Sequence, residues 1–192
     1  MINIAEWSKI AQDDFKSMQF DSGMIVKNFD PTSVTPPADA DIICTTSSGI
    51  TVTCTPTMVD LGEDVNNLHG RFAELQYISQ FEVTLAFTAL NITPDVLKLA
   101  LGSATITAAS GKVVPTFAID TTTDFTDITW IGRRVDGGLV AATIKNAYST
   151  GGLSLSTSKD QKGNLSVTLT GFMKMANQST PPVEFYSISP AA

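Results

Sequence analysis

The sequence is short of the residues on which most catalytic and metal sites depend. Its 192 residues include one histidine, His69, and two cysteines, Cys44 and Cys54. A hydrolase triad needs an imidazole beside its nucleophile, and a zinc site needs three or four His, Cys or carboxylate ligands at compatible spacings. His69 precedes Gly70 in what reads as a loop, so we expect a surface or hydrogen-bonded structural histidine. The chain is therefore predicted to be no enzyme and to hold neither a metal nor a cofactor.

Charge is scarce as well, positive charge above all. Charged residues make up 16% of the chain, and 12 Lys and Arg stand against 19 Asp and Glu, for a net charge of −7. Affinity for nucleic acid comes mainly from clustered cations, and the largest basic cluster is the pair Arg133 and Arg134. Tight DNA binding is therefore not expected. The uncharged surface is either ordinary Ser- and Thr-rich sheet or is covered by neighbouring subunits.

Long apolar runs are missing too. No stretch approaches the roughly 18 apolar residues of a membrane helix, and the N-terminus lacks the basic flank and apolar core of a secretion signal. We therefore expect neither secretion nor a membrane span. Cys44 and Cys54 flank a turn at 47–49, which predicts that they face each other across a hairpin. Outside the secretory route, free thiols are favoured over a disulfide.

What the sequence does have is regular alternation of apolar and polar residues, clearest between 125 and 172. A period of two indicates β-strands. Two runs, 153–158 and 165–170, are joined by a polar segment too short for a parallel crossover, so they form an antiparallel hairpin. Each run has a face of small hydroxyls and an apolar face, and the apolar face, with Leu155 and Val167, is expected to be buried.

Further strands show the same signs. Residues 126–130 and 139–147 form another hairpin around Asp136-Gly137-Gly138, and the long run 72–90 is expected to pair within the 125–172 stretch. Shorter strands are predicted at 23–27, 42–45, 50–55, 112–119 and 183–188.

One helix is predicted at about 93–102. Thr93 can cap it, Pro94 suits its first position, and Gly102 ends it. The expected fold is mainly β, a sandwich or barrel of antiparallel strands with this one flanking α-helix.

Two acidic segments could in principle bind a metal ion or catalyse hydrolysis. The loop at 63–67 has oxygen ligands but lacks the spacing of a calcium loop. Asp120, Asp124 and Asp127 could hold a metal or form a glycosidase site. In both places a solvated loop is the favoured interpretation.

Five segments match a known family in their order and spacing. They lie at 23–31, 55–67, 94–101, 145–153 and 181–186, and the most distinctive reads Lys145-Asn146-Ala147-Tyr148-Ser149-Thr150-Gly151-Gly152-Leu153. They are spread over most of the chain, and together they resemble the major tail tube protein of long non-contractile bacteriophage tails.

The resemblance implies one tail-tube domain over 1–192, with an N-terminal arm at 1–22 and an extended loop at 31–42. It implies a structural virion protein that polymerises as stacked hexameric rings into a tube whose lumen carries DNA. The implied partners are other copies of the chain, the tape measure and tail terminator proteins, and DNA in transient, non-specific passage, with no membrane. The implied location is the phage tail, assembled in the bacterial host cytoplasm.

A channel for DNA should be acidic or neutral, because rings of Lys or Arg would retain the duplex. Two polar strand faces are therefore candidates for the lumen lining, Glu82, Thr84 and Thr88 on one and Ser166, Thr168 and Thr170 on the other. For either set, an outer solvated face is the alternative. Edge strands and long loops are candidates for subunit contacts: Asp60, Leu61, Gly62, Glu63, Asp64, Val183, Phe185 and Tyr186.

A second hypothesis is a β-sandwich recognition module, such as a tail adhesin or capsid decoration protein. Such a module would present aromatic residues in a cleft or an exposed loop. The larger aromatics lie mostly within strand patterns, which predicts core or interface positions: Phe81, Phe87, Phe117, Trp130 and Phe172. A third hypothesis, a carbohydrate-active enzyme using Asp120 to Asp127, lacks the partner groups that the chemistry needs.

Overall fold

The computed structural model describes residues 12–33 and 35–190. The first half of the expected N-terminal arm, residues 1–11, lies outside the described residues, as does residue 34 of the expected loop at 31–42. The described part of the arm contains a short 3-10 helix, Gln12–Phe15, and the start of the first strand.

The described elements are mostly strands, which confirms the mainly β class. They are β1 Gln19–Lys27, β2 Ile42–Cys44, β3 Thr46–Asp60, β4 Gln76–Ala89, α2 Pro94–Leu101, β5 Ala104–Thr107, β6 Lys112–Pro115, β7 Thr126–Arg134, β8 Leu139–Ser149, β9 Ser154–Ser156, β10 Asn164–Gly171 and β11 Val183–Ile188. Three more 3-10 turns lie at Asp39–Asp41, Ala73–Leu75 and Met175–Asn177.

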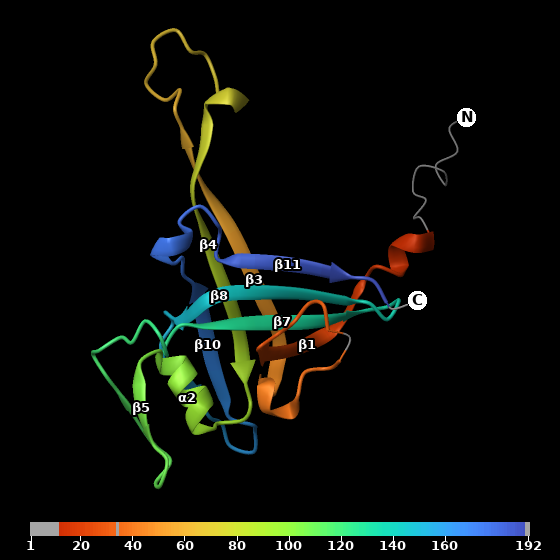
Figure 1. Ribbon diagram of the computed structural model, residues 1–192, viewed down its shortest axis with the longest axis vertical. Helices are drawn as coiled ribbons and strands as arrows, with labels where there is room; N and C mark the ends of the chain where they lie inside the picture. The colour runs from red at the N-terminus through yellow and green to blue at the C-terminus, as the bar shows by residue number, and fades with distance from the viewer. Residues whose placement is uncertain (1–11, 34, 191–192) are drawn as a thin grey trace.

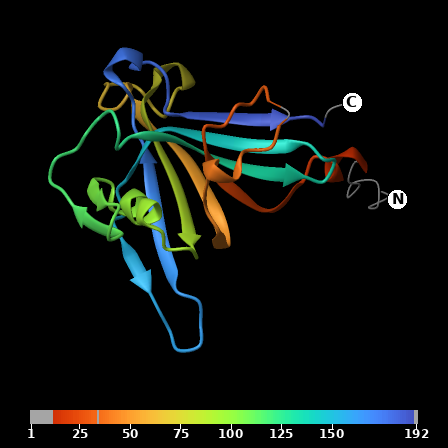
Figure 2. The same ribbon diagram turned by 60° about the horizontal axis from the view of Figure 1, so that its bottom comes forward.

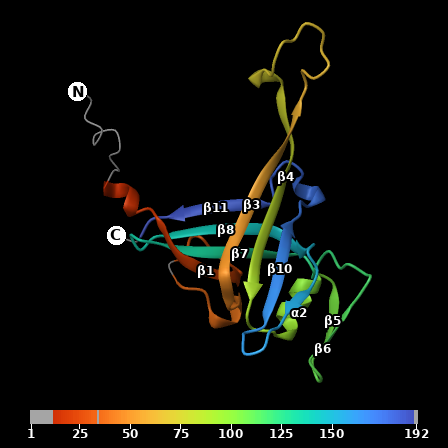
Figure 3. The same ribbon diagram turned by 180° about the vertical axis from the view of Figure 1, so that it is seen from behind.

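All the strand pairs are antiparallel, and β8 divides the main sheet into two layers. The order is β2-β1-β7-β8-β10-β4-β3, with β11 also on β8. The first part of β8 pairs with β11, and its last residues pair with β10. Figure 1 shows β7, β8 and β11 running across β3, β4 and β10, and Figure 3 shows the same crossing from behind. Within the described residues no ladder joins β3 to β1 or β2, so the sheet is sandwich-like and not a closed barrel.

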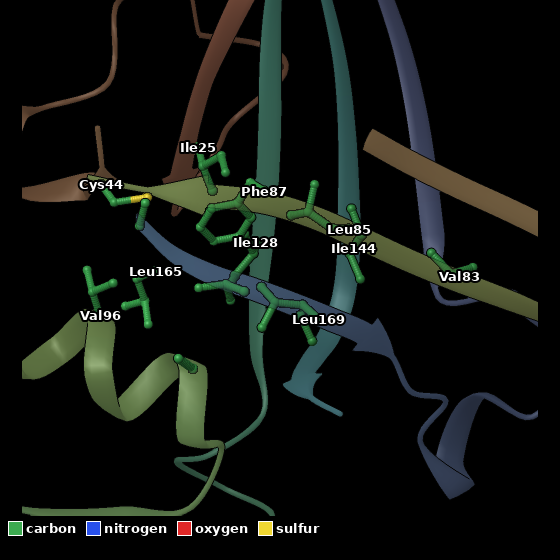
Figure 4. Packing of buried hydrophobic residues seen from close by; sticks show 14 residues of the cluster. Ile25, Cys44, Val83, Leu85, Phe87, Val96, Ile128, Ile144, Leu165 and Leu169 are labelled. Atoms are coloured by element: carbon green, nitrogen blue, oxygen red, sulfur yellow. The ribbon is translucent and has the colours of Figure 1, made fainter. Parts of the chain in front are cut away.

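The core lies between the two layers and under α2. Ile25, Ile128 and Ile144 come from β1, β7 and β8, and they meet the inner faces of β4 and β10 (Figure 4). Burying such a side chain stabilises the fold by about 1.5–3 kcal/mol. The inner faces contribute Val83, Leu85, Phe87, Leu165, Val167 and Leu169, and α2 adds Val96 and Ala100.

Helix α2 follows its sequence signals closely. The Thr93 hydroxyl accepts a hydrogen bond from the Val96 amide at 3.3 Å, and Pro94 is the first helical residue. Gly102 ends the helix with φ 82°, a conformation that favours glycine. The helix predicted at 93–102 is therefore confirmed, and it covers one end of the core.

The predicted hairpin between 42–45 and 50–55 is wrong. β2 pairs with β1, where Cys44 lies opposite Ile25, whereas β3 pairs with β4, where Cys54 lies opposite Val83. The two strands therefore belong to different layers of the fold, β2 to the layer of β1 and β7, and β3 to the layer of β4 and β10. Each pairs with a strand more distant in sequence, so that its apolar face packs into the core from its own side. Both cysteines are free thiols, as expected, and burial raises the pKa of Cys44 to about 11.

The predicted burial of Leu155 is also wrong, although Val167 is buried as expected. β9 has three residues and pairs with β10 alone, so Leu155 lies opposite the buried Leu165 yet remains 47% exposed. The second layer and α2 cover the apolar face as far as β10 and no further. Figure 2 shows the turn between β9 and β10 projecting away from the body.

Candidate assembly and channel surfaces

The outer sides of β3, β4 and β10 form one polar surface, which we call the hydroxyl face. The alternating burial of β4 and β10 assigns one set of side chains to the core and the other set to this surface. Threonine and serine hold all but three of its positions. The residues are Ser47, Thr51, Thr53, Thr55 and Thr57 on β3, Gln80, Glu82, Thr84, Ala86 and Thr88 on β4, and Ser166, Thr168 and Thr170 on β10.

Strand register joins the two candidate lumen sets into one surface. Thr88 lies opposite Ser166, and Thr84 lies opposite Thr170. The sequence had assigned them to two separate faces, because a period of two says nothing about which strands are neighbours. The β3 residues of the hydroxyl face were missed, although the alternation in Thr51-Val52-Thr53-Cys54-Thr55 is a visible signal for them.

The hydroxyl groups bond to one another across the strands. Thr53 Oγ1 and Thr84 Oγ1 are 2.5 Å apart, and Thr150 Oγ1 lies 2.7 Å from Thr170 Oγ1 at the β8 border. Threonine is stiff at χ1, so such rows are well ordered. Glu82 is the one charged residue among those assigned to the face, and none of them is Lys or Arg. The face is thus a polar wall of short side chains without a positive charge.

β3 and β4 continue beyond the other strands as a two-stranded projection, residues 57–78, which is prominent in Figures 1 and 3. Its tip has internal order. The Leu61 amide donates to the Leu75 carbonyl at 2.8 Å, and the Asp60 carboxylate accepts from the Gly62 amide at 2.9 Å. A Cβ at Gly62 would lie 2.8 Å from Cδ1 of Leu75, so the Leu75 side chain packs closely over this turn.

The projection carries many exposed apolar side chains. Leu61 is 62% exposed, and the other exposed large apolar residues there are Met58, Val59, Val65, Phe72, Tyr77 and Ile78. The predicted contact residues Asp60, Leu61, Gly62, Glu63 and Asp64 therefore lie at the base and tip of a surface that a monomer would leave uncovered. His69 is exposed on the same tip.

β11 is an edge strand, as expected for the last predicted strand. It pairs with β8 and with no other strand of the described chain. Val183 packs against the core, Phe185 is 61% exposed, and the Tyr186 ring meets Phe29 edge-on at 5.8 Å. Of the predicted contact residues on this strand, Phe185 is the one that remains free for a partner.

An ionic network ties β11 to β8. Lys145 Nζ lies 3.2 Å from a Glu184 oxygen and 3.3 Å from an Asp127 oxygen, and the Tyr186 hydroxyl donates to Glu184 at 2.5 Å. The hydrogen bond from Tyr186, followed by that from Lys145, lowers the pKa of Glu184. Burial favours the neutral amine of Lys145, but the hydrogen bond to Glu184 and the charge of Asp127 raise its pKa overall.

The three carboxylates of the acidic loop do not converge on one site. Asp120 accepts from Thr122 and Thr123 within its own turn. Asp127 bonds to the Asn146 amide and to Lys145. The third carboxylate, that of Asp124, makes a different set of contacts.

Asp124 belongs to a nearly buried cluster beside α2. Its carboxylate accepts from the Ser103 hydroxyl at 2.8 Å and the Asp120 amide at 3.0 Å, and Lys98 Nζ is 3.4 Å away. Burial raises its pKa, but these hydrogen bonds and the Lys98 charge lower it overall. A groove of about 800 Å³ contains Asp124 and Asp127, and both are already paired with lysines. The cluster fixes a loop and offers no free acid and base.

Across residues 12–33 and 35–190, no group of three or more His, Cys, Asp or Glu side chains is placed to hold a metal ion. None of the helices in that part of the chain is long and apolar enough to cross a membrane. No protein-family model matches the chain, and no curated protein matches it either.

Proposed function

We propose that the protein is the structural subunit of a phage-type tail tube, in which copies assemble as stacked hexameric rings around a channel for DNA. The observation that carries the proposal is the hydroxyl face, which extends over β3, β4 and β10 without a cation. Phosphate groups sliding past a Lys- or Arg-lined wall would exchange counterions for contacts, and repeated rings of such contacts would hold the duplex. A wall of short hydroxyls with Glu82 as its charge avoids this retention.

The uncovered apolar surfaces support assembly. The projection exposes Leu61, Phe72 and Tyr77, and β11 exposes Phe185. Exposed apolar area of this extent marks an interaction surface in most soluble proteins. Other copies of the chain are the proposed partners, with tape measure and tail terminator proteins at the two ends of the tube. On this proposal the protein resides in the virion tail after assembly in the host cytoplasm, and it is not an enzyme.

Phe117 favours the second candidate function, a recognition module. Its side chain is fully exposed in the loop after β6, so the strand predicted over 112–119 ends early and a core position is wrong for this residue. A ring presented in this way can stack on a ligand. Phe87, in contrast, is buried as expected.

Electron microscopy of the purified protein tests the two candidates. The tail-tube proposal predicts rings or tubes with a central channel. Uniform monomers that bind a glycan array, and lose that binding in Phe117→Ala, would contradict it and favour recognition.

A further inference from the structure

Residues 172–175, Phe-Met-Lys-Met, form an exposed apolar knob. Met175 is 84% exposed and Met173 is 46% exposed. The base of the knob is fixed, because the Phe172 ring packs edge-on against Phe125 at 5.5 Å and the Phe172 amide donates to the Lys145 carbonyl. Lys174, between the two methionines, is also exposed and carries the only charge from 172 to 178. Methionine adapts its shape to a partner surface, which suits it to such a contact.

An apolar groove of about 530 Å³ is lined in part by residues of 30–33 and 35–41. Met24, Ile131, Leu139 and Ile188 line it, together with Pro36 and Pro37. Its charged lining residues among the described part of the chain are Asp30 and Asp41, and there is no cation. The groove therefore offers an apolar floor and an acidic rim.

The knob and the groove lie at opposite ends of β11. The strand starts at Val183, after the loop that bears the knob, and ends at Ile188, in the groove. Figures 1 and 2 both show β11 running from the loop after β10 toward the turn between β7 and β8. Six extended residues span about 20 Å, and the ladder with β8 keeps β11 straight. One copy cannot place its knob in its own groove.

We propose that the knob of one copy docks into the groove of a second copy. Met173 and Met175 cover the apolar floor, and Lys174 lies between the carboxylates of Asp30 and Asp41. The two surfaces differ, so the contact is head-to-tail, and repetition closes a ring when the rotation per copy allows it. In the proposed tube, this contact would join neighbouring subunits within each ring. Only this placement within a ring rests on the proposed function.

Charge reversal on each side tests the contact by sedimentation velocity. Lys174→Glu places like charges together, and Asp41→Lys replaces one of the two rim carboxylates with a cation, so each variant alone should associate at least about tenfold more weakly than the wild type. An equimolar mixture of the two variants should recover association, because the unchanged Lys174 of the Asp41→Lys variant then meets the unchanged groove of the Lys174→Glu variant, and the reversed knob meets the groove that has gained a cation. Lys112→Glu on β6, which lines neither surface, is the matched control and should associate normally.

Asp41 accepts a hydrogen bond from Asn28, so a melting curve must accompany Asp41→Lys. If that variant does not fold, Met175→Asp gives a second test on the knob side, since an exposed side chain can change without loss of the fold. Unchanged association of Lys174→Glu or Met175→Asp overturns the contact, as does a mixture that does not recover or a wild type that stays monomeric at its highest soluble concentration. Normal tubes from Lys174→Glu would contradict the contact and leave the proposed function intact. Association that depends on Lys174, in a protein that never forms tubes, would support the contact and contradict the proposed function.

Discussion

The two faces of the β3, β4 and β10 layer share one backbone but differ in burial, since one face packs in the core and the other is the hydroxyl face. Side chains alternate between the two faces along each strand. Leu85 and Val167 point inward and are fully or almost fully buried, whereas their sequence neighbours Thr84 and Thr168 lie on the hydroxyl face. The inner face supplies the free energy of folding, because apolar area leaves water there. The outer face contributes little to that burial, so its composition is free to serve a function. Substitutions on the two faces should therefore fail in different assays.

The largest effect is expected on the inner face. Val167→Asp would bury an unpaired charge in a close-packed core and remove an apolar contact, so the folded state should be lost. Thr168→Asp, one residue away on the hydroxyl face, should melt within a few degrees of the wild type. Circular dichroism melting of the pair measures the difference, and equal melting temperatures would mean that the register of β10 is inverted.

The next effect concerns the projection. Leu61→Ser combined with Phe72→Ser removes two exposed apolar side chains that have no role in the main core. We expect an unchanged melting temperature and a loss of ring or tube formation. Electron microscopy with a parallel melting curve measures both. Thr105→Ser, an exposed change on β5, is the control, and tubes of normal length from the double serine variant would count against the projection as a subunit contact.

A smaller and more specific effect is expected from lysines on the hydroxyl face. Thr84→Lys and Thr168→Lys add cations to the proposed wall at two half-buried positions of the hydroxyl face. Tubes should still form, while DNA delivery slows, most strongly at low salt where counterion release is most favourable. Thr105→Lys adds the same charge away from the face and should not slow delivery. Full infectivity with both face lysines present would place the hydroxyl face outside the channel.

The smallest effect concerns the Asp124 cluster. The pKa of the Asp124 carboxyl in the folded protein lies below its value in the unfolded chain, which is about 3.9 for aspartate. The ionised carboxylate therefore stabilises the fold fully above that unfolded pKa, and the contribution is lost as the pH falls through the lower folded pKa. Asp124→Asn should cost about 1–3 kcal/mol at neutral pH, where a hydrogen-bonded charge is replaced. Denaturant titrations at neutral pH and at about pH 3 test this, and an equal cost at both would contradict it.

The comparison of the two faces also explains what the sequence could predict. Alternation identified the β7–β8 hairpin, the end of β11 and the inner residues of β10, because periodicity is a local property. It could not show that β2 leaves β3 for β1, or that Leu155 lies past the covered part of the core, since both depend on contacts between distant segments. The hydroxyl face shows the same limit. Its residues were visible in three separate strands, and only the register of β4 with β3 and β10 made them one surface.

A cryo-electron microscopy reconstruction of tubes assembled from the purified protein tests directly whether the hydroxyl face lines the channel. We expect Thr84, Thr88 and Thr168 to lie at the inner radius, facing the channel, with the core side of β4 and β10 and helix α2 farther from the axis. A reconstruction in which the hydroxyl face lies on the outer wall or is buried between rings would contradict this expectation.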